Sequence, residues 1–211
     1  MVAAAAFIAA VLSAGPGRVN AGPITIADIN ADSVDSSYLH IPGLLTIQED
    51  HIGVSVNRQD GSTQLFPDAF LSLSSLLTSD TSSGGLASGS FANGSLRVRD
   101  NAAGPTDLLL GSMVALDLSE VEFVFGTFVS RQIVATGSFA VTGGTLASDF
   151  GPQGQIAAAM YSLSTNPSDF STVDFSGQSK VSLLPVPEPS SLALLVPAGL
   201  TTLMVRPRRR H

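Results

Sequence analysis

The chain has 211 residues, of which 13% are charged and 44% are hydrophobic, and its formal net charge is −7. Residues 22–184 hold 5 basic and 16 acidic side chains, so this body carries a net charge of −11. An acidic body of this size repels phosphate backbones and excludes nucleic acid as an expected partner, while divalent cations and neutral or cationic polymers remain open. The absence of cysteine excludes disulfides and thiolate metal sites. The length fits one domain once the two ends are set aside.

The N-terminal end has the pattern of a secretory signal peptide. Residues 2–14 form an apolar, alanine-rich stretch, and Val19-Asn20-Ala21 follows as a cleavage site of the small-x-small type. We expect cleavage after Ala21, although no Lys or Arg precedes the apolar stretch. The alternative interpretation is a buried alanine-rich helix.

The body begins with an acidic segment that invites a calcium interpretation. Asp28, Asn30 and Asp32 supply oxygen ligands at positions 1, 3 and 5 of an EF-hand type loop. Ser33 then stands where that loop needs glycine, and Leu39 stands where it needs a bidentate glutamate. The pattern therefore favours a turn rich in Asx residues, and a calcium site of another type remains open.

The rest of the body predicts β-strands separated by breaks rich in glycine and serine. Segments 44–58 and 63–66 predict a hairpin around Asp60-Gly61, which is a strong turn signal. The segment 70–77 fits a strand or a helix. Further β-type runs follow in the sequence at 90–99, 108–141, 145–150, 155–164, 172–175 and 180–184.

About a dozen short runs of this kind predict an all-β fold. We expect a single antiparallel β-sandwich or jelly-roll-like domain over residues 22–184. It would be flanked by an N-terminal signal helix over residues 1–21 and a short C-terminal transmembrane helix within residues 185–211.

The residues that could carry chemistry form no recognisable site. His40 and His51 lie eleven positions apart without a zinc-binding pattern, and Asp50 is expected on the strand face opposite to His51. Glu120 and Glu122 share a strand face at a separation that could suit glycoside hydrolysis, but a solvated face is the expected role. No G-x-S-x-G motif or phosphate loop is present. We therefore expect no catalytic residue, no metal site and no cofactor.

The C-terminal end has three parts in a fixed order. Pro187, Glu188 and Pro189 form a stiff, extended motif. Residues 190–205 carry no charge and would make a helix of about 24 Å, which is short for a hydrocarbon core of about 30 Å. A basic tail ends the chain and should stay on the cytoplasmic side of a membrane; its arginines are Arg206, Arg208, Arg209 and Arg210.

These three parts together resemble the PEP-CTERM sorting signal of Gram-negative bacteria. The resemblance covers about an eighth of the chain, and it implies nothing about the fold of the body. It implies recognition and cleavage near Pro187-Glu188-Pro189 by an exosortase-type membrane protease, after transient anchoring in the inner membrane. Proteins with this signal tend to accompany exopolysaccharide production. The alternative is an ordinary membrane anchor that is never cut.

Two functions fit the sequence. The first is an exported, non-enzymatic protein of the cell surface or extracellular matrix, associated with exopolysaccharide or biofilm. The second is a carbohydrate-binding module or a glycoside hydrolase on a jelly-roll scaffold, which would need exposed aromatic side chains and an acid pair.

Overall fold

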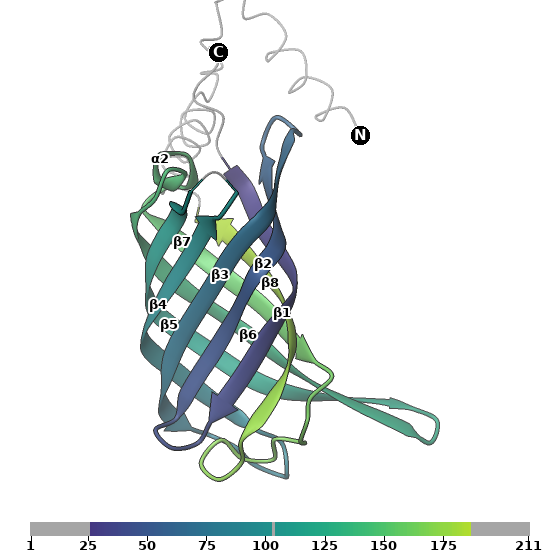
Figure 1. Ribbon diagram of the computed structural model, residues 1–211. Helices are drawn as coiled ribbons and strands as arrows, with labels where there is room; N and C mark the ends of the chain where they lie inside the picture. Colours follow the sequence, from purple (N-terminus) through teal and green to yellow (C-terminus); the bar gives the residue numbers. More distant parts are fainter. Residues whose placement is uncertain (1–25, 103, 187–211) are drawn as a thin grey trace, which may run out of the picture.

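A computed structural model describes residues 26–102 and 104–186 of the chain as a closed antiparallel barrel (Figure 1). Each strand pairs with its neighbours in sequence, and β1 pairs with β8 to close the barrel. The elements are β1 (Ile26–Leu39), β2 (Leu44–Arg58), β3 (Thr63–Asp80), β4 (Ser88–Asp100), β5 (Thr106–Phe125), β6 (Phe128–Gly143), α2 (Ala147–Phe150), β7 (Gln153–Tyr161) and β8 (Phe175–Pro185).

The predicted all-β class is confirmed, but the predicted sandwich or jelly roll is wrong. One sheet closes on itself around a single interior, so there are no two sheets to pack face to face. The strands are also longer than the short runs expected from the sequence; β5 alone has 20 residues. Strands of this length can tilt around a barrel, and β5 extends beyond its pairing with β4, which reaches Ser119.

The sequence suggested too many strands because interruptions of the pattern are bulges within continuing strands. Ser33 has φ 58° and lies in β1 where the pairing register shifts. The separate runs 63–66 and 70–77 are one strand, β3, whose pairing with β2 shifts between Phe66 and Ala69. A bulge inserts one residue, bends the strand and leaves the ladder to continue beyond it. Reading each such point as a strand end divided single strands into pieces.

Several local predictions have clear outcomes. The hairpin around Gly61 is confirmed as the β2–β3 turn, and the ambiguous segment 70–77 is part of strand β3. The predicted strand at 145–150 is wrong, because Ala147–Phe150 is the short helix α2. Most of the run at 172–175 lies in the loop before β8, which begins at Phe175. The run at 180–184 lies within β8.

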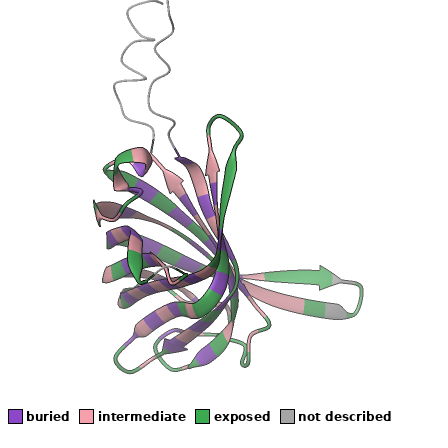
Figure 2. Cartoon of the chain, turned by 45° about the horizontal axis from the view of Figure 1, so that its top comes forward, coloured by how far each residue is buried: buried purple, intermediate pink, exposed green. Residues whose placement is uncertain are grey.

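The interior of the barrel holds the apolar side chains, and the outside holds the polar ones. Along β3, Leu71 and Leu73 are buried while Ser72 and Ser74 face outward. The same alternation runs through the barrel parts of the other strands, and Figure 2 shows it as bands of buried and exposed residues along the ribbons. Burial of these inward side chains provides the main stabilisation of the fold.

Aromatic side chains occupy both ends of the interior. At the end beside α2, the ring of Phe150 packs on Phe139 with centroids 5.7 Å apart. At the other end, Phe170 comes from the loop between β7 and β8 and is fully buried. Its ring lies 5.3 Å from that of Tyr38 and 5.5 Å from that of Phe91, so it plugs this mouth of the barrel.

The predicted ends of the chain cannot be compared with the structure. The signal peptide with Ala21, the sorting motif, the apolar helix at 190–205 and the basic tail all lie outside the described residues. Among residues 26–102 and 104–186, no helix has the length and apolar character needed to span a membrane.

Candidate functional site

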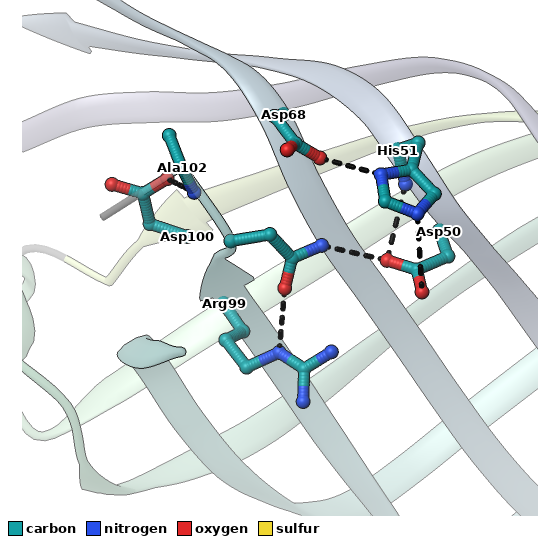
Figure 3. A network of polar contacts seen from close by, with 7 residues as sticks. Asp50, His51, Asp68, Arg99, Asp100 and Ala102 are labelled. Carbon is teal, nitrogen blue, oxygen red and sulfur yellow. Dashed lines mark hydrogen bonds and ion pairs between the residues drawn. The ribbon is translucent and has the colours of Figure 1, made fainter. Parts of the chain in front are cut away.

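A network of polar side chains lies on the outer face of β2, β3 and the loop after β4 (Figure 3). Nδ1 of His51 lies 2.8 Å from Oδ1 of Asp68. The amide of Asn101 donates to Asp50 over 2.7 Å and accepts from Nε of Arg99 over 2.9 Å. These contacts tie the loop after β4 to the middle of β2.

A bulge in β2 brings Asp50 and His51 into the same network. His51 has φ 59°, and the pairing of β2 with β3 shifts between Glu49 and Ile52. The prediction that Asp50 and His51 point to opposite faces is therefore wrong, because the regular alternation of a strand is interrupted at this point. Asp68 and Asn101 were not singled out from the sequence, and no local pattern marks them.

The environment of His51 favours a charged imidazolium. The hydrogen bond with Asp68, followed by the negative charge of Asp50, raises the pKa of His51. The second ring nitrogen, Nε2, lies 3.9 Å from Oδ2 of Asp50. A protonated imidazole between two carboxylates can form ion pairs with both and so link strands. It is poorly suited to act as a general base, because it has no free nitrogen to take a proton from a nucleophile.

His40 makes a separate contact at the turn between β1 and β2. Its main-chain N–H and its ring Nδ1 each lie 2.7 Å from Oδ1 of Asp174. These two contacts lower the pKa of Asp174. The two histidines thus contact different carboxylates, and within the described residues no group of three His, Cys, Asp or Glu side chains could hold a metal ion.

Glu120 and Glu122 share a strand face, but Glu120 is not solvated as expected. Its side chain is fully buried, where it accepts from the main-chain N–H of Ala87 over 2.9 Å and from Arg131 over 3.2 Å. Arg131 also contacts Glu122 over 2.8 Å, and this hydrogen bond is the main reason that the pKa of Arg131 is raised. One guanidinium holds both carboxylates, so neither is a free acid for glycoside hydrolysis.

The acidic segment at the start of the body forms part of strand β1 and does not form the expected Asx-rich turn. Asp28 accepts a hydrogen bond from Asn57 on β2, and Asn30 accepts one from Ser182 on β8. Asp32 lies 3.0 Å from Nζ of Lys180. These side chains point outward to neighbouring strands and fix the register of β1.

A feature without a local sequence signature is a band of hydroxyl groups around the outside of the barrel. Cross-strand pairing places one Ser or Thr beside the next on six consecutive strands. The hydroxyl of Ser74 lies 3.1 Å from that of Ser95. The band, in spatial order from β8 to β5, is Ser176, Ser37, Thr46, Ser74, Ser95 and Ser112.

A surface hollow of about 410 Å³ lies at the β8 end of this hydroxyl band. Asp35 and Gln48 line it together with Ser37 and Thr46 of the band, and Ser164 approaches from the loop after β7. The hydroxyl of Ser164 lies 3.1 Å from that of Ser176. Hydroxyl, amide and carboxylate groups in one hollow offer both donors and acceptors to a ligand.

Comparisons of the chain with models of protein families, with curated proteins and with solved structures gave no match.

Proposed function

We propose that the chain is an exported, non-enzymatic protein of the cell surface or extracellular matrix, processed by an exosortase-type membrane protease and associated with exopolysaccharide. The observation that carries this proposal is the ordered C-terminal sequence of Pro187-Glu188-Pro189, an uncharged apolar run and an arginine cluster. The barrel ends directly before it, since β8 stops at Pro185.

The arrangement of the barrel ends supports this proposal. Ile29 on β1 pairs with Leu183 on β8 in antiparallel fashion, so β1 begins and β8 ends at the same rim. Cleavage before Ile26 and after Val186 would remove no residue of either strand. The folded domain could therefore lose both export signals without losing a pairing that closes the barrel.

The outer surface supports an association with a hydroxylated polymer. The hydroxyl band presents side chains that both donate and accept hydrogen bonds, as the hydroxyls of a polysaccharide do. The net charge of −11 on residues 22–184 repels nucleic acid and favours neutral or cationic polymers. The histidine and glutamate side chains that could serve catalysis are held in ion pairs, which supports a role without turnover.

The sorting step can be tested in the native host. In the wild-type chain we expect release from the inner membrane and a shortened C-terminus. Replacement of Pro187, Glu188 and Pro189 together by alanine should leave the chain in the membrane with its arginine tail. The matched control replaces Ser190 and Ser191 by alanine and should behave as the wild type. Equal release of the motif variant would contradict the proposal.

A second candidate is a carbohydrate-binding module, which the hollow beside the hydroxyl band favours. The combined substitution Ser37→Ala and Gln48→Leu should weaken binding of a neutral exopolysaccharide from the host in calorimetry. Ser112→Ala, at the far end of the band, is the control. Equal affinities of the two variants would argue against this binding surface.

A further inference from the structure

The distal parts of β5 and β6 form an arm that leaves the barrel, and we define it as residues 121–132 (Figure 1). The pairing of β5 with β4 reaches Ser119, and the pairing of β6 with β7 begins at Ile133. Between these points the two strands pair only with each other. Both outer edges of the arm therefore lack a neighbouring strand among the described residues.

The arm carries apolar side chains into solvent. Phe123 is 39% exposed, Val124 62% and Val129 51%, and Figure 2 shows the arm standing clear of the barrel. No charged residue occurs between positions 123 and 130. An exposed strand edge with apolar side chains and unused main-chain hydrogen-bonding groups is a template for pairing with another strand.

The base of the arm is fixed to the barrel by buried polar contacts. The carboxylate of Glu120 accepts from the main-chain N–H of Ala87, while the main-chain N–H of Glu120 donates to the Ala87 carbonyl over 2.8 Å. Arg131 joins Glu120 to Glu122 across the two strands. These contacts hold the arm in one direction, which lowers the entropic cost of presenting its edge to a partner.

We propose that the arm pairs with the arm of a second copy of this chain, antiparallel along the outer edge of β5 and centred on Phe123. A two-fold interface must be complementary to itself. In this register Phe123 lies opposite its own counterpart, and position 121 lies opposite position 125. Apolar residue types stand at all three positions, namely Val121, Phe123 and Phe125.

The charges of the arm are compatible with this register. Glu122 falls opposite Val124 of the second copy and not opposite the second Glu122, and its own Arg131 neutralises it over 2.8 Å. The five residues 121–125 extend about 17 Å from the barrel at about 3.4 Å per residue. This length exceeds the Debye length of about 8 Å at physiological salt, so repulsion between the two acidic barrels is largely screened.

The edge that becomes buried is small. Five paired residues per copy bury less than the roughly 1,000 Å² of a stable interface, so the dimer should dissociate on dilution. Crowding of copies on one surface would raise their effective concentration and favour pairing.

The register can be tested by cross-linking the full chain, because it contains no natural cysteine. Opposed residues in an antiparallel pair have Cα atoms about 4.5–5.5 Å apart, within the range of a disulfide. Phe123→Cys should therefore form a disulfide-linked dimer under mild oxidation. Val129→Cys, which is more exposed but lies on β6, is the matched control and should not. Equal cross-linking of both variants, or none by Phe123→Cys, would overturn the proposal.

The association can be tested by sedimentation of the full chain over a range of concentrations. The mass of the wild type should rise towards a dimer, and Phe123→Lys should raise the dissociation constant at least about tenfold because two lysines would oppose each other. Val114→Lys, on the barrel part of β5, should match the wild type. A wild type that stays monomeric up to about millimolar concentration, or an associating Phe123→Lys variant, would overturn the proposal.

Discussion

The hydroxyl of Tyr38 donates a hydrogen bond to the main-chain carbonyl oxygen of Phe170, which lies 132 positions further along the chain. The bond joins the end of β1 to the loop that carries the aromatic plug. Burial, followed by the charges of Asp80, Asp174 and Asp169, raises the pKa of Tyr38 to about 12, so the phenol remains a donor at physiological pH. The Tyr38 side chain therefore links β1 to the Phe170 loop that closes this end of the barrel.

Tyr38→Phe should lower the free energy of unfolding by about 1–3 kcal/mol, because it keeps the ring and leaves the buried Phe170 carbonyl without its donor. Urea denaturation of the two proteins measures this difference. Tyr161→Phe, at the half-buried end of β7, is the matched control and should change stability less. Equal effects of the two substitutions would show that the bond to Phe170 does not stabilise the plug.

Gly137→Ala should destabilise the barrel far more than Gly53→Ala. A Cβ at position 137 would overlap the carbonyl oxygen of Ala115 on the neighbouring strand, whereas a Cβ at position 53 has no atom within 4 Å. Neither glycine has a positive φ, so the difference isolates the close approach of β5 and β6. Thermal unfolding of both variants measures it. Similar midpoints would contradict the tight β5–β6 packing.

His51→Gln should change how stability depends on pH. The folded pKa of His51 is raised, so the stabilisation from its ion pairs is fully present below the unfolded pKa of about 6.5. It is lost as the pH rises through the raised folded value. Denaturation of wild type and variant at a series of pH values should show the curves converging on the alkaline side. A constant difference across this window would exclude the charged bridge.

Arg131→Met should destabilise the base of the arm, because it leaves the Glu120 carboxylate buried without its counter-charge. Adding Glu120→Gln removes that charge and should restore part of the lost stability. Glu122→Gln, at the half-exposed partner, should have the smallest effect of the three changes. Unfolding midpoints give the ranking, and a double variant less stable than Arg131→Met would contradict the role of the buried charge.

Local sequence patterns predicted the strands but not their assembly. The segment 44–58 was correctly predicted as a strand and Gly61 as part of a hairpin turn, whereas the pattern of 70–77, now part of β3, fitted a strand or a helix equally. Closure depends on the pairing of β1 with β8, whose sequences are far apart and carry no mutual signature. Bulged positions such as Ser33 resemble turns locally, because both require unusual backbone angles.

The candidate site was predictable only in part for the same reason. His51 and Asp50 were identified as adjacent polar residues, but their common face depends on a bulge that the sequence does not mark. The buried carboxylate of Glu120 accepts a hydrogen bond from the main-chain N–H of Ala87, which comes from the loop between β3 and β4 and is distant in sequence. The hydroxyl band depends on the register of six strands, in which single serines become neighbours only after folding.

The central proposal, export and sorting of the barrel, is tested most directly by the intact mass of the mature protein purified from its native host. We expect a mature chain that begins at Gly22 and ends near Pro187-Glu188-Pro189, without residues 192–211. A mature chain that starts at Met1 and retains Arg210-His211 would contradict it.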